Sequence, residues 1–201
     1  MKKFIIAIMM IAVATTAVAQ KVSKAASKQA KEFTKQGWVV TPGARPLELQ
    51  FDRSYQMQDE MDDNGYSKFI MAEAMSVAAS YDAAKVQALD LAKVNLAGML
   101  QTQVAALVES SAGNKQLAAE DAESIAETAQ ASKSLIAQNI GRIITVVECY
   151  RVKPNKNKEV YVKIAYNSHM AMEATKKVIR EELSKKSENL HSKLDKLFGA
   201  H

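Results

Sequence analysis

The 201-residue chain is poor in the residues that metal, redox and nucleophilic chemistry use most often. It has one cysteine, Cys149, which can form no internal disulfide and no thiolate metal site by itself. The three histidines, His169, His191 and His201, belong to no HExxH or HxH pair. The seven glycines build no phosphate-binding loop, and no serine sits in a GxSxG turn. We therefore expect no catalytic residue, no cofactor and no metal, that is, a protein that is not an enzyme.

Strong charge and long apolar runs are also scarce. The formal net charge is +5, and it falls to +3 without residues 1–19, which carry two lysines and no acidic residue. So small an excess of basic over acidic residues is unlike a nucleic-acid binder, which carries a concentrated basic patch, and we expect no nucleic-acid partner. No later apolar run approaches the roughly 20 residues of a spanning helix, so we expect no transmembrane span in the mature chain.

Residues 1–19 have the parts of an export signal. Residues 1–3 are basic, residues 4–13 are apolar, and residues 15–19 end in the small-x-small pattern that signal peptidase requires. The alternative for this short apolar run is a buried core helix. We predict export, with the protein in the periplasm or associated with the outer membrane.

Residues 20–46 read as a basic leader followed by a linker. Breakers at Gly37, Pro42, Gly43 and Pro46 interrupt residues 37–46, where Trp38 is expected to anchor the segment. The preceding lysines would form one stripe of a helix, which is either solvated or in weak contact with an anionic surface such as lipid headgroups or envelope polysaccharide. These lysines are Lys21, Lys24, Lys28, Lys31 and Lys35.

Apolar periodicity indicates a single α+β domain over residues 47–185. Small residues on one face of the first strand would let the long alanine-rich helix after it approach closely. We expect a small antiparallel sheet of about three strands, packed against a long antiparallel helical pair, with a long C-terminal helix whose residues 186–201 extend beyond the core. The expected elements are helices from residue 47 and over 80–107, 119–140 and 168–198, and strands over 69–77, 143–152 and 159–166.

Two stretches carry a family resemblance. One is FIMAEAMSVAASYDAAKVQALDLAKVNLAGML, and the other is SKSLIAQNIGRIITVVECYRVKPNKNKEVYVKIAYN, whose last strand reads Tyr161-Val162-Lys163-Ile164. Over residues 67–185 the chain resembles the domain shared by Lpp-twenty-type outer-membrane lipoproteins and the N-terminal region of the flagellar assembly protein FlgT. It also resembles small secreted proteins of Bacteroidetes-type bacteria. The resemblance implies an envelope location and an α+β domain used for assembly or attachment, with no catalytic residue; the lipobox cysteine of the lipoproteins is missing here.

Some carboxylates could carry chemistry. Glu73 and Glu148 each interrupt an apolar strand face, where a buried carboxylate needs a partner or a raised pKa. The simpler interpretation is exposure at a sheet edge or pairing with a basic residue, for which Arg142, Arg151 and Lys163 are the candidates. An acidic run before Asn64-Gly65 is interpreted as a solvated turn, with a calcium site as the alternative. It comprises Asp59, Glu60, Asp62 and Asp63.

The leading functional prediction is an exported, non-enzymatic interaction or assembly domain of the bacterial envelope. Its expected partner is an envelope protein or a second copy of the chain, with peripheral membrane contact as a further role. The alternative is a binding module for a small ligand or envelope glycan, in a pocket beside the sheet lined by Trp38, Tyr55 or Tyr150. Cys149 lies in an alternating apolar run and is expected to be a buried hydrophobe.

Overall fold

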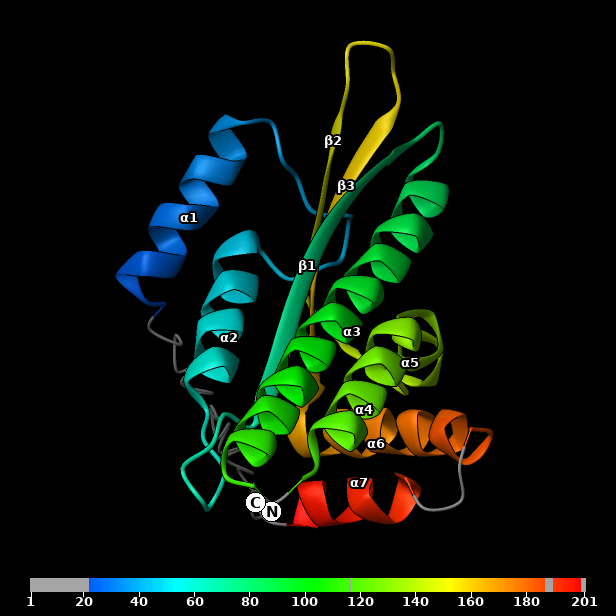
Figure 1. The fold of residues 1–201 in the computed structure, drawn as a ribbon. Helices are drawn as coiled ribbons and strands as arrows, with labels where there is room; N and C mark the ends of the chain where they lie inside the picture. The colour runs from blue at the N-terminus through cyan, green and yellow to red at the C-terminus, as the bar shows by residue number, and fades with distance from the viewer. Residues whose placement is uncertain (1–21, 116, 187–189, 200–201) are drawn as a thin grey trace, which may run out of the picture.

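A computed structural model describes residues 22–115, 117–186 and 190–199 of the chain (Figure 1). These residues form an α+β structure, which confirms the predicted fold class. None of the helices in these ranges is both long enough and apolar enough to cross a membrane. The predicted export signal lies outside the described residues. The elements are α1 (Lys24–Lys35), α2 (Leu47–Asp59), β1 (Phe69–Ala78), α3 (Tyr81–Gly113), α4 (Ala119–Ala131), α5 (Lys133–Asn139), β2 (Ile144–Val152), β3 (Lys158–Asn167), α6 (Ser168–Ser184) and α7 (Leu190–Gly199).

The sheet is antiparallel and has the order β1-β3-β2. The predicted hairpin of β2 and β3 is present, and β1 pairs along the other side of β3, with Glu73 opposite Lys163. The register between β2 and β3 shifts between Thr145 and Val147, so the buried Val146 and Val147 both pack on the α2 side of the sheet. Because β3 is central, β1 and β2 are the two edge strands.

The long helix α3 packs on one face of the sheet. Its buried row of small residues, Ala84, Ala88 and Ala92, lies against the Ile70 and Ala72 side of β1, as the sequence predicts. The small side chains let the helix backbone approach the strands closely. Ser80 caps α3, with the Ala83 N–H donating to its hydroxyl at 3.2 Å. Further along, α3 diverges from the sheet and packs against α4 and α5, the expected antiparallel pair (Figure 1).

Helices α1 and α2 cover the opposite face, so the molecule has three layers (Figure 1). Ala26 and Ala30 of α1 are fully or almost fully buried against a cluster that includes Trp38, Phe51 and Tyr161. The leader helix is therefore packed on the domain by its apolar face, while its described lysines are exposed, as expected of a solvated stripe. Three alanines and one phenylalanine are a thin apolar stripe by themselves, and here a second helix and the sheet supply the remaining contacts.

The helix predicted over residues 119–140 is interrupted between α4 and α5 at Ser132. The buried Ser132 hydroxyl donates to the Thr128 carbonyl at 2.7 Å. A serine that bonds back to the preceding turn competes with the helical ladder and bends the chain. The predicted apolar stripe still holds across the bend, since Ile125, Ile136 and Ile140 are all buried.

The C-terminal helix also differs from the prediction. It ends at Ser184, and α7 folds back beneath α6 instead of projecting beyond the core (Figure 1). Leu194 and Leu197 of α7 are buried with Ile179 and Leu183 of α6 in one cluster. Folding back is favourable because a projecting α7 would leave these leucines in water.

Candidate functional site

β1 is an edge strand whose outer side is largely open. The Asn95 side chain donates to the Glu73 carbonyl at 2.9 Å, so the Glu73 backbone faces away from β3. In an antiparallel strand the N–H and C=O groups of one residue point to the same side, and this side alternates along the strand. The outward residues of β1 are therefore Phe69, Met71, Glu73, Met75 and Val77. Within the described structure only the Glu73 carbonyl has a hydrogen-bond partner on this side.

The edge of β2, by contrast, is covered. Val39 forms two backbone hydrogen bonds with Tyr150, at 2.8 and 2.9 Å, as an isolated antiparallel bridge. The Gln50 side chain of α2 accepts the Glu148 N–H at 2.7 Å. These contacts occupy the outward N–H group of Glu148 and both outward backbone groups of Tyr150, in the middle of β2. Since covering an edge prevents further strands from adding to it, the two edges of this sheet differ in what they can bind.

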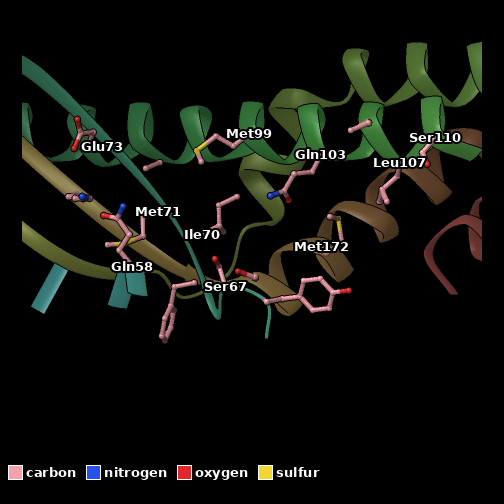
Figure 2. Close-up of a pocket in the computed structure, with 16 residues that line it drawn as sticks. Gln58, Ser67, Ile70, Met71, Glu73, Met99, Gln103, Leu107, Ser110 and Met172 are labelled. Carbon is pink, nitrogen blue, oxygen red and sulfur yellow. The ribbon is translucent and has the colours of Figure 1, made fainter. Parts of the chain in front are cut away.

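A groove lies beside the open edge, between β1, α3 and the start of α6 (Figure 2). Its volume is about 920 Å³. Its apolar lining includes three methionines: Met71 comes from β1, Met99 from α3 and Met172 from α6. Met99 is 44% exposed. Flexible, polarisable methionine side chains are suited to surfaces that adapt to the shape of a partner.

One row of α3 residues, spaced four apart, runs along β1, and its last three members line this groove. Polar and apolar residues alternate in the row. Gln87 accepts a hydrogen bond from the Ser76 hydroxyl at 2.7 Å, and Asn95 bonds the Glu73 carbonyl. Next to them, Leu91 is 46% exposed. Asn95 of α3 thus occupies one outward carbonyl of β1, and the outward backbone groups of Met71 and Met75 on either side of it have no partner in the described structure. The row is Gln87, Leu91, Asn95, Met99, Gln103 and Leu107.

Glu73 is exposed on β1, as the edge-exposure interpretation expected, and its carboxylate accepts a hydrogen bond from Tyr161 at 2.6 Å. Burial of the phenol, followed by the hydrogen bond and negative charge of Glu73, raises the pKa of Tyr161. Tyr161 therefore stays protonated and acts as a hydrogen-bond donor. The carboxylate lines the far end of the groove with Lys163, so it contributes charge to the groove.

Glu148 is partly buried on the α3 face of β2, with 22% of its side chain exposed. The Lys85 ammonium lies 2.9 Å from its carboxylate, and the Tyr81 hydroxyl donates to the same oxygen. Burial and this hydrogen bond raise the pKa of Tyr81. The predicted pairing of Glu148 with Arg142, Arg151 or Lys163 is wrong, because α3 brings Lys85 over the sheet. The arrangement is a satisfied ion pair and ties α3 to β2.

The three aromatic residues proposed to line a pocket do not meet. Trp38 is buried between α1 and the sheet and also borders a surface groove at the end of α1. Tyr55 packs on the same face and donates to Gln29 at 2.6 Å. Tyr150 lies on the opposite face, with its ring centroid 5.3 Å from that of Tyr81. The sequence could not show that the sheet separates Tyr150 from Trp38 and Tyr55.

The remaining candidates, Cys149 and the acidic turn, make contacts that stabilise the fold. Cys149 is buried, as predicted, and burial together with the charge of Glu148 raises the pKa of its thiol to about 12. In the acidic turn, Asp62 accepts the backbone N–H groups of Asn64 and Tyr66, both at 2.9 Å, and Glu60 pairs with Lys68 at 2.6 Å.

No group of three or more His, Cys, Asp or Glu side chains in the described ranges is placed to hold a metal ion. His169 is exposed at the start of α6, while His201 and the side chain of His191 lie outside the described part.

Sequence reasoning did not identify the groove. Alternation in residues 69–77 showed large apolar side chains on one face of β1, but it could not show that β1 is an edge strand. Comparison with family models, with curated proteins and with solved structures finds no match to this chain. The geometry of the β1 edge and its groove therefore carries the functional argument.

Proposed function

We propose that this protein is a non-enzymatic, exported interaction domain of the bacterial cell envelope, which binds an extended polypeptide segment along the free edge of β1. The contrast between the two sheet edges carries this proposal: Val39 and Gln50 cover β2, whereas the outward groups of Met71 and Met75 have no partner in the described structure. A polypeptide that adds a strand would satisfy these groups by main-chain hydrogen bonds. The export signal predicted in residues 1–19 and the resemblance to envelope assembly domains support the location.

The groove determines the chemistry expected of the partner. Alternate side chains of an added strand point to opposite faces of the sheet. Those on the α3 side would enter the groove beside Met99, Leu107 and Met172. The partner segment should therefore carry apolar residues at every second position, and the methionines would tolerate several shapes at these positions.

Site-specific photo-crosslinking tests strand addition. A photoreactive phenylalanine analogue at position 99, in the groove, should give a protein adduct in cells that produce the protein, whereas the same analogue at position 152, exposed at the end of β2, should not. Met71→Pro removes one outward N–H group but no hydrogen bond to β3, since proline is tolerated on the solvent side of an edge strand. We expect this change to reduce the amount of adduct at least about fivefold, because the loss of one net hydrogen bond, about 1 kcal/mol, weakens binding by about that factor.

Met71→Ala is the matched control, because it shortens the same side chain and keeps the N–H group. An adduct that survives Met71→Pro, or that Met71→Ala removes equally, would contradict main-chain pairing. An adduct of twice the chain mass would identify a second copy as the partner.

A second candidate function is binding of a small ligand or glycan in the same groove. The volume of about 920 Å³ lies within the range of ligand pockets. This candidate predicts no protein adduct from position 99. In a ligand screen, a bound ligand should raise the melting temperature of the wild-type protein. Met99→Trp, which fills the groove, should abolish this rise.

A further inference from the structure

A second surface, formed by α1 and the segment after it that covers the β2 edge, combines positive charge with an exposed apolar shelf. Four lysines of α1 are exposed on one helix face, and none of them forms an ion pair with another residue in the described ranges. They are three or four residues apart, the spacing that aligns side chains on a helix. Glu32, on the same helix, is the nearest acidic residue in the sequence. The four are Lys24, Lys28, Lys31 and Lys35.

The scaffold holds this lysine face in place. The Ser23 N–H, at the start of α1, donates to the Asp52 carboxylate of α2 at 2.8 Å. Phe33 packs against Trp38 and Phe51, with ring centroids 5.8 and 4.9 Å away. Since α1 is attached to the domain along its length, its lysines act together as one charged surface.

The apolar shelf adjoins the lysines at the end of α1. It is a shallow groove of about 600 Å³, bordered by Lys31 and Lys35 and floored by apolar residues that include Trp38 and Leu47. At its rim Val39 is 46% exposed, held there by its bridge to Tyr150. Glu48 also lines the shelf. The surface therefore presents cations beside apolar contact area, which is the arrangement of peripheral membrane-binding segments.

We infer that the α1 lysine face and the Val39 shelf dock this protein on a lipid bilayer that contains anionic phospholipid. The lysines complement the lipid phosphates, while Val39 and the shelf offer apolar contact that a soluble polysaccharide would leave unused. Each lysine close to an anionic membrane strengthens partitioning roughly fivefold. This surface is distinct from the β1 groove, so bilayer docking and polypeptide binding can succeed or fail independently.

Vesicle co-sedimentation of the processed protein, starting at Gln20, tests the inference. The probes are vesicles of phosphatidylcholine alone and vesicles in which about one third of the lipid is phosphatidylglycerol. Binding is expected only to the anionic vesicles and should weaken as added salt screens the charges. Wild-type protein that ignores the anionic vesicles, or that binds both kinds equally, would overturn the inference.

Charge-matched variants separate this face from net charge. Lys31→Glu with Lys35→Glu should lower the partition coefficient more than about tenfold, because charge reversal replaces attraction with repulsion. Lys177→Glu with Lys185→Glu, at exposed positions on α6 and at its C-terminal cap, changes the net charge equally and should retain most of the binding. Equal losses in the two double variants would show attraction by net charge alone and refute the assigned face.

The apolar contribution has its own variant. Val39→Asp should weaken vesicle binding several-fold while leaving the lysines intact. Unchanged vesicle binding by Val39→Asp, together with full competition from a soluble anionic polysaccharide, would assign the lysine face to polysaccharide and overturn the lipid inference. Circular dichroism and melting curves confirm that each variant folds.

Discussion

Substitution of Leu194 by alanine tests the packing of α7, the element on which the structure and the sequence prediction differ most. Leu194 is fully buried in a cluster with Ile125, Ile179 and Leu183, which come from α4 and α6. If α7 projected into solvent, as predicted from the sequence, Leu194→Ala would have little effect. In the folded-back structure it removes a core side chain and should be strongly destabilising.

The magnitude follows from the buried volume that is lost. Leu→Ala deletes three carbon atoms, and at about 0.8 kcal/mol for each buried methylene the transfer contribution is about 2.4 kcal/mol. The remaining cavity adds to this, so we expect a loss of about 3 kcal/mol in the free energy of unfolding, within the usual range of about 2–5 kcal/mol. For a chain of this size the melting temperature should fall by about 6–12 °C.

Urea unfolding followed by circular dichroism measures this loss, and hydrogen exchange shows where it arises. If the core relaxes as a unit, the midpoint shifts and amide protection falls throughout. If α7 undocks locally, its amides lose protection first, and the loss of stability is limited to the docking free energy of α7.

Leu91→Ala is the matched control. It is the same chemical change at a side chain that is 46% exposed, and it should cost less than about 1 kcal/mol. A Leu194→Ala protein with the wild-type urea midpoint and unchanged exchange in α7 would refute the packing described for this helix.

Three further predictions concern the sheet and its helices. Burial opposes ionisation of Glu159, but the hydrogen bond and charge of Arg151 outweigh it and lower the pKa of the carboxyl. The stability from this pair is thus complete above the unfolded pKa of about 4.3 and is lost as the pH falls through the lower folded pKa. Glu159→Gln should therefore lower the free energy of unfolding at neutral pH by on the order of 1 kcal/mol. In acid, the urea midpoints of the variant and the wild-type protein should converge. The Cys149 thiol, with a pKa of about 12, should react with an aromatic disulfide reagent at pH 8 only after denaturation; rapid reaction of the native protein would contradict its burial. Ala88→Leu should cost about 1–3 kcal/mol in urea unfolding by overpacking α3 on the sheet, whereas Val86→Leu, at a position 58% exposed, should change little.

Local periodicity predicted the regular elements well where one face is buried along the whole length. Alternation in residues 159–166 located β3, whose Val160, Val162 and Ile164 are fully buried. Periodicity failed where two helices continue one apolar pattern. Ile179 and Leu183 of α6 and Leu194 and Leu197 of α7 keep a helical spacing, because both helices bury the same kind of side chain in one cluster. Spacing alone does not distinguish a long helix from two helices that fold back.

The candidate site could not be predicted from the sequence for a related reason. Glu73, Tyr55 and Trp38 were singled out for their chemistry, whereas the open β1 edge depends on strand order. Neither the alternation of a strand nor its composition indicates which other strand it pairs with. The methionines of the groove come from β1, α3 and α6, so their convergence is a property of the tertiary structure.

By itself, the sequence determined the α+β class, the close approach of an alanine-rich helix to a small-residue strand face, and the scarcity of groups for catalysis. These properties depend on side-chain size, period and residue type, which are local. Tertiary structure alone decided that β2 is covered and β1 is open, since the groups that cover β2 come from distant segments: Gln50 bonds Glu148 across 98 positions of the chain. The outward backbone groups of β1 are open because the strand order places β1 at the other edge of the sheet, with β3 in the centre.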